Sequence, residues 1–89
     1  MEDLLNMIDM KSWRNLLFLA RMVIPNFEKD MGLEKFIDMM PILLCLISKA
    51  LSIAKKNGEK EECEKEAIEI YSQFLKTKAA KKFFNRQLN

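Results

Sequence analysis

Apolar side chains occupy most positions between residues 12 and 24, and this density predicts a helix that is buried on most of its sides. At 100° per residue they surround the helix axis almost completely: Trp13, Leu16, Leu17, Phe18, Leu19, Ala20, Met22, Val23 and Ile24. Pro25 ends this helix, because a proline disfavours helical geometry in the residue before it. A shorter helix is expected near residues 2–8, where Glu2 and Asp3 suit the positive end of a helix dipole.

A second apolar segment predicts a helix from about residue 33 to 56, with a break or kink at 38–41. The reason for the break is Pro41, which donates no backbone hydrogen bond and clashes with the preceding turn. Gly58 then stops the helix, because glycine accepts the left-handed conformation that closes a helix. The uncharged run at 39–47 is shorter than the ~20 residues that span a bilayer, so we interpret this segment as a buried core helix.

The last helix is predicted to run from about residue 59 to 84, and it carries two apolar stripes. The first stripe has the spacing of a core-facing side: Cys63, Ala67, Ile70 and Phe74. The second lies on nearly the other side of the helix: Ile68, Leu75, Ala79 and Phe83. A surface helix of a monomer needs only one such stripe. We therefore take the four residues of the second stripe as candidate partner-binding residues.

Composition supports an all-α fold, a small bundle of three to four helices within a single domain that covers residues 1–89. The chain has two glycines and two prolines, so turn points are few, and 49% of its residues are hydrophobic. Leucine, lysine and glutamate are the most frequent residues, and all three favour helices. The apolar surface is more than one 89-residue monomer easily hides. We therefore expect that homodimerisation completes the core.

Charge is distributed unevenly along the chain, although the net charge is only +2. Residues 59–75 carry six glutamates and two lysines, a net of −4, whereas residues 76–89 carry five basic residues and no acid. These basic residues are candidate phosphate-binding groups: Lys76, Lys78, Lys81, Lys82 and Arg86. They project in several directions around the predicted helix. We interpret them first as a solvated helix end that is matched to the negative end of the dipole, and second as a phosphate-binding group.

Enzyme chemistry finds little support in the sequence, and we expect neither catalytic residues nor a cofactor, a metal or a small-molecule substrate. The chain has no histidine, which removes the commonest general base and metal ligand. Carboxylates around Cys63 disfavour a thiolate there, and Cys45 stands in an apolar run. In a hairpin closed at Gly58 the two cysteines are offset by about seven residues, or roughly 10 Å, which is too far for a disulfide.

Two functions remain in competition. The first is a non-enzymatic helical protein–protein interaction or regulatory module, which acts by homodimerisation or by docking on a larger protein. The alternative is a nucleic-acid-binding accessory protein that uses the basic C-terminal helix end. Attachment to a membrane ranks below both. Unpaired cysteines and an acidic rather than basic N-terminus lead us to expect a cytoplasmic protein.

Overall fold

A computed structural model describes residues 12–88 of the chain, with side chains to Asn85, and this part consists of helices and short connections, without strands. The elements are α2 (Trp13–Val23), the 3-10 helix η1 (Ile24–Glu28), α3 (Leu33–Lys56), α4 (Lys60–Leu75) and α5 (Lys78–Leu88). The all-α prediction is confirmed for these residues. The short helix expected near 2–8 lies outside the described part.

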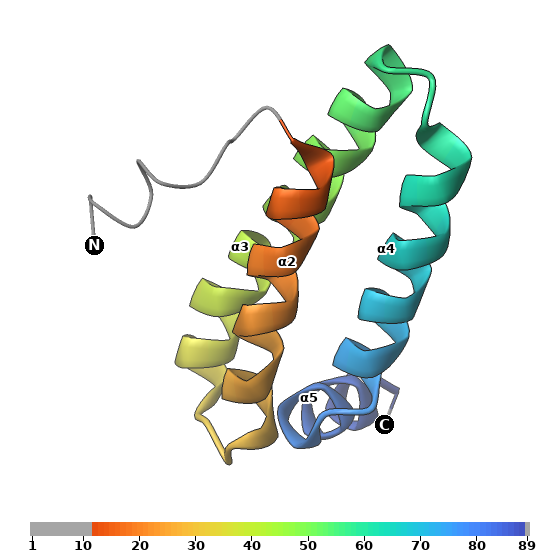
Figure 1. The fold of residues 1–89 in the computed structure, drawn as a ribbon. Helices are drawn as coiled ribbons and strands as arrows, with labels where there is room; N and C mark the ends of the chain where they lie inside the picture. The colour runs from red at the N-terminus through yellow and green to blue at the C-terminus, as the bar shows by residue number, and fades with distance from the viewer. Residues whose placement is uncertain (1–11, 89) are drawn as a thin grey trace, which may run out of the picture.

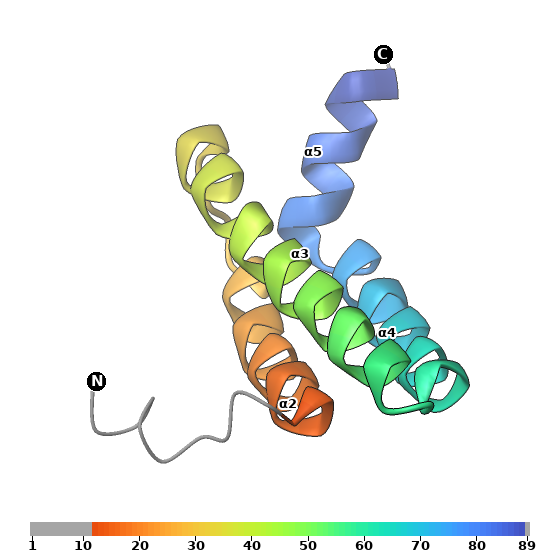
Figure 2. The same cartoon turned by 90° about the horizontal axis from the view of Figure 1, so that it is seen from above.

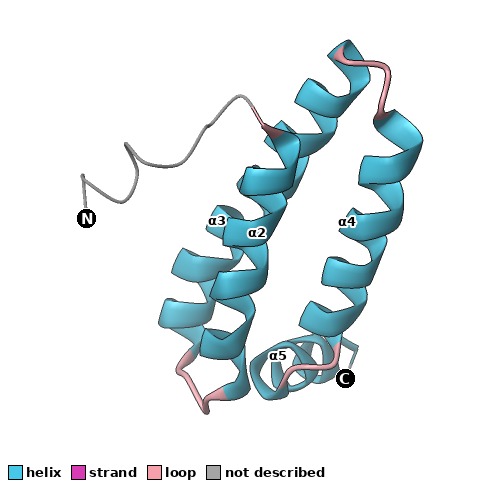
Figure 3. Cartoon of the chain, viewed as in Figure 1, coloured by secondary structure: helices cyan, strands magenta, loops and turns pink. Residues whose placement is uncertain are grey.

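Three of the helices run side by side as an up-and-down bundle (Figure 1), and α5 crosses at one end of it. A view from above shows α5 leaving the end of α4 and diverging from the first half of α3 (Figure 2). Short connections join the helices (Figure 3). Between α3 and α4 the chain turns at Gly58, whose φ of 75° is the left-handed conformation expected of a glycine that closes a helix.

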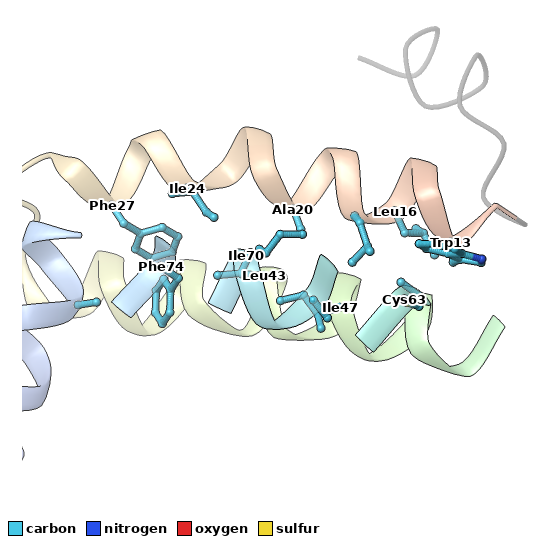
Figure 4. Close-up of a cluster of buried hydrophobic side chains, with 14 of the residues drawn as sticks. Trp13, Leu16, Ala20, Ile24, Phe27, Leu43, Ile47, Cys63, Ile70 and Phe74 are labelled. Atoms are coloured by element: carbon cyan, nitrogen blue, oxygen red, sulfur yellow. The ribbon is translucent and has the colours of Figure 1, made fainter. Parts of the chain in front are cut away.

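One apolar core lies between α2, α3 and α4 (Figure 4), and each helix contributes one row of side chains to it. The rows follow the spacing of three and four residues that keeps side chains on one helix face. The contributions are Trp13, Leu16, Leu17 and Ala20 from α2; Phe36, Leu43, Ile47, Ala50 and Ala54 from α3; and Cys63, Ala67, Ile70 and Phe74 from α4. The core-facing stripe predicted for residues 63–74 is thus confirmed.

An aromatic cluster closes the end of the core where α5 crosses. Phe27 meets Phe74 edge to face, with ring centroids 5.0 Å apart, and Phe36 lies 5.7 Å from Phe27. Phe83 of α5 stacks on Phe36 with centroids 4.5 Å apart. Such pairs add to the free energy gained from burial alone. The cluster therefore fixes α5 against the start of α3.

The last helix differs from the prediction of one helix over residues 59–84, because α4 ends at Leu75 and α5 begins at Lys78. Thr77 makes the turn and is fully buried. Its hydroxyl donates a hydrogen bond to the Phe74 carbonyl at 2.6 Å and accepts one from the Ala80 amide at 3.4 Å. The second of these bonds is an N-cap, which satisfies an otherwise orphan amide at the start of α5.

The other two long helices match their expected ranges but differ in how they are covered. α3 passes through Pro41 without a break. Pro41 is exposed, so the backbone hydrogen bond that it cannot donate is missing away from the packed core. α2 is not buried on most sides, because Phe18 and Met22 on its outer face are 59% and 55% exposed. Its neighbours α3 and α4 cover only one face.

α3 is long and apolar enough to cross a bilayer, as judged by length and composition alone. Only 22% of its apolar window is buried in the fold, so the expected buried core helix is in fact covered on one face. A polar stripe runs along its outer side: Asp38, Cys45, Lys49, Ser52 and Lys56. Half-exposed apolar side chains lie on the two flanks between this stripe and the core, Ile37 on one flank and Ile42 on the other.

Candidate partner-binding groove

An apolar groove of about 330 Å³ runs between α3 and α4 on the outer surface of the bundle. Helix α3 contributes Ile47 and Leu51 to its walls. The remaining walls come from α4: Glu64, Ala67, Ile68, Tyr71, Ser72 and Leu75. The groove is therefore a helix-lined channel with apolar walls and one carboxylate, a composition suited to another helix and not to a polar substrate.

The exposed wall of the groove is the flank of α4 next to its core face. Ile68, Leu75 and Tyr71 are 65%, 45% and 39% exposed. With Glu64 they recur at intervals of four, three and four residues, so they stand in one row along the helix. No described element covers this row, because α3 packs against the neighbouring core face and α5 crosses only at the end.

The four residues of the predicted second stripe do not stay together in the structure. Ile68 and Leu75 line the groove. The turn at Thr77 carries the other two away from it: Ala79 is buried, with 6% exposure, and Phe83 is half-buried against Phe36. Because a turn redirects the helix axis, a stripe projected through it describes two separate surfaces. The structure therefore places only the first pair on an accessible face.

Ile47, Leu51 and Tyr71 belong to the groove but were not among the residues selected from the sequence. The hairpin at Gly58 supplies a signal that could have found two of them. It places residue i opposite residue 115 − i, so Ile47 faces Ile68 and Leu51 faces the position of Glu64. Helix pairing across a known turn therefore predicts groove walls better than the stripe of one helix does.

The opposite flank of α4 is electrostatically bound to α2. Arg14 contacts Glu62 at 3.1 Å and Glu59 at 3.3 Å, and Arg21 contacts Glu66 at 3.2 Å. These exposed pairs contribute little stability individually. They show that the acidic flank of α4 faces α2, while the exposed apolar row of α4 faces the groove.

No protein-family model, curated protein or solved structure matches this chain. Its function is therefore inferred from the groove and from the charged groups beside it.

The five candidate phosphate-binding residues lie near the turn and on α5. Lys76 caps α4, and Lys78 is the first residue of α5. Lys78 and Lys81 are exposed, and Lys82 is engaged by Asp30 at 3.1 Å. The side chain of Arg86 lies outside the described part. The dipole of α4 favours a positive charge at Lys76, and the dipole of α5 favours one at Arg86 in its last turn, whereas Lys78 stands at the positive end of α5.

The cysteines are unpaired, as expected, with Cys45 exposed and Cys63 buried. Burial is the main cause that raises the pKa of Cys63 above its ordinary value, and Glu66 and Glu64 raise it further, while Arg14 lowers it. A thiol with a raised pKa stays protonated and is a poor nucleophile. Among residues 12–88, no group of three or more acidic or thiol side chains is arranged to hold a metal ion.

Proposed function

We propose that this protein is a non-enzymatic helical interaction module that binds a partner helix in the groove between α3 and α4. The observation that carries the proposal is the uncovered row of Ile68, Tyr71 and Leu75 beside the apolar wall of α3. Exposed apolar surface of this kind, gathered in one groove, is characteristic of interaction sites.

Helix-in-groove recognition explains how such a site works. A partner helix presents apolar side chains at intervals of three and four residues, and these enter the spaces between the groove residues. Full burial of one leucine or isoleucine stabilises by roughly 1.5–3 kcal/mol, so completing the half-finished burial of Ile68 and Leu75 contributes about 1–2 kcal/mol each. The partner contributes a similar amount from its own side chains.

The test compares two isoleucines of similar exposure on different faces. Ile68→Glu places a charge in the groove, whereas Ile42→Glu places one on the far flank of α3, where the native side chain is 53% exposed. Both variants should keep the helical circular dichroism of the wild type. We expect Ile68→Glu alone to lose association, measured by sedimentation and by pull-down from a nuclease-treated lysate of the native host. Equal behaviour of the two variants would contradict the proposal.

A second candidate function is nonspecific nucleic-acid binding, which is supported by three lysines grouped around the turn. Lys76, Lys78 and Lys81 are exposed, and no ion pair joins them to another described residue. Three phosphate contacts on duplex DNA give a log–log salt slope of about −2.7. A flat salt response, or unchanged affinity after all three lysines become glutamine, would exclude this candidate. Sensitivity to Ile68→Glu without sensitivity to salt favours the groove instead.

A further inference from the structure

We infer that the partner helix in the groove is α4 of a second copy of this chain, packed antiparallel about a two-fold axis near Tyr71. The inference rests on the proposed function and names its partner. Each copy supplies both an exposed row on α4 and an apolar wall on α3, so one arrangement fills two grooves at once. Such an isologous contact is the commonest way in which soluble chains pair.

The row on α4 has the spacing of a helix-pairing seam. Glu64, Ile68, Tyr71, Leu75 and Lys78 follow one another at intervals of four, three, four and three residues. This is the repeat by which two helices interdigitate over successive turns. The last position lies past the turn at Thr77, so the helical part of the seam ends at Leu75.

An antiparallel register makes the seam complementary to itself. When residue i lies opposite residue 143 − i of the second copy, Ile68 packs against Leu75 and Tyr71 lies next to the symmetry axis. Each contact then occurs twice in the dimer, once on either side of the axis. The apolar centre of each seam is thereby covered by the apolar centre of the other.

Charge decides the direction of packing. Glu64 stands at one end of the seam and Lys78 at the other, while Lys76 lies next to Lys78 but faces Ile24 and Pro25; all three are partly or fully exposed. Among the described residues, the one ion pair of Glu64 is an exposed contact of 3.6 Å with Lys60 on its own helix. Antiparallel packing brings the acidic end of one copy to the basic end of the other. Parallel packing would oppose like charges at both ends, which is destabilising.

Charge exchange tests this arrangement by sedimentation equilibrium of the full chain at low salt. We expect the wild type to form dimers at micromolar to submillimolar concentrations. Glu64→Lys makes both ends of the seam basic and should weaken the dimer about tenfold or more. Adding Lys78→Glu to that variant should restore the dimer, because opposite charges again meet in the antiparallel register. Failure of the double variant to recover affinity would overturn the inferred direction.

Disulfide trapping reads the register directly in a Cys45→Ser background. In the register of i opposite 143 − i, Ser72→Cys places the two thiols one residue apart along the seam, about 1.5 Å, beside the axis, where a disulfide can form. Glu64→Cys places them about 15 residues apart along the seam, or roughly 22 Å. We expect rapid cross-linking of the first variant and none of the second. Cross-linking of both variants would indicate parallel packing and overturn the inference.

The outcomes separate this inference from the proposed function. A wild-type chain that stays monomeric at submillimolar concentration overturns the second copy as partner. The groove then still stands as a binding site if Ile68→Glu, but not Ile42→Glu, loses a partner from the lysate. A wild-type dimer that neither Ile68→Glu nor Glu64→Lys disturbs also overturns the second copy as partner, because the copies then meet on another face; the proposed function falls as well if Ile68→Glu and Ile42→Glu retain the same partners from the lysate.

Discussion

Thr77 sets the direction of α5, and its hydroxyl is the group on which that direction depends. Thr77→Val removes the hydroxyl but keeps the volume and the branching of the side chain. Two hydrogen bonds are lost, one to the Phe74 carbonyl and one from the Ala80 amide. Both Thr77 and Ala80 are fully buried, so water cannot readily replace the missing partner.

The expected loss of stability in Thr77→Val follows from the N-cap hydrogen bond. Loss of an N-cap hydroxyl costs about 0.5–2 kcal/mol, and an unsatisfied buried amide falls in the range of about 1–3 kcal/mol. Both ranges refer to the same hydrogen bond between the Ala80 amide and the Thr77 hydroxyl, so they are not added. We expect the free energy of unfolding to fall by about 1–2 kcal/mol. In a domain of this size, 1 kcal/mol lowers the melting temperature by about 4–8 °C. Thr77→Val should therefore melt about 4–16 °C below the wild type.

Amide hydrogen exchange by NMR, alongside thermal melts, identifies the cause. The Ala80 amide should lose protection in Thr77→Val, because its acceptor is gone. Thr77→Ser is the matched control: it loses a methyl group worth about 0.8 kcal/mol but keeps the acceptor. Protection of Ala80 should survive in that control even if the melting temperature falls slightly. Unchanged melting and unchanged Ala80 protection in Thr77→Val would refute the capped turn and favour one continuous helix.

Three further predictions concern the core and its edges. At pH 8 an alkylating thiol reagent should modify the exposed Cys45 well before the buried Cys63. Because the pKa of Cys63 in the folded state lies above its ordinary value of 9.0, the free energy of unfolding should fall as pH rises above 9. Cys63→Ala should remove that fall. Arg21→Met should change the free energy of unfolding by less than about 1 kcal/mol in denaturant titrations, because its pair with Glu66 is partly solvated. Phe83→Ala should destabilise by about 2 kcal/mol in the same titrations, roughly half the cost of a fully buried phenylalanine.

The bounds of α2 and α3 could be predicted from the sequence because local chemistry marks their ends. Pro25 and Gly58 act within one turn of their own positions, so no distant residue is needed to interpret them. The core row of α4 is also predictable, because its spacing is periodic over three turns. Element ends and core rows therefore depend on information that lies within a short window.

The turn between α4 and α5 was missed because it contains neither glycine nor proline. Its marker is Thr77, which caps a helix only if that helix begins at Lys78. The lysines and alanines near the turn are good helix formers and hide the boundary. A tertiary contact supports the turn as well, because Phe83 of α5 stacks on Phe36 of α3. A contact between residues 47 positions apart is invisible to periodicity.

This turn also changes what kind of partner the site can hold. A continuous helix would have offered a stripe from Ile68 to Phe83, long enough for one helix to pack along α4 alone. With Ala79 and Phe83 withdrawn into the core, the exposed row spans only Ile68 to Leu75, about 10 Å of helix. So short a row cannot form a stable interface by itself, and the wall of α3 must take part.

Leu51→Glu on α3 should therefore weaken association about as strongly as Leu75→Glu on α4, and sedimentation of the two variants at equal concentration compares them directly. If Leu51→Glu leaves association intact, the partner contacts α4 alone and the groove is not its binding site.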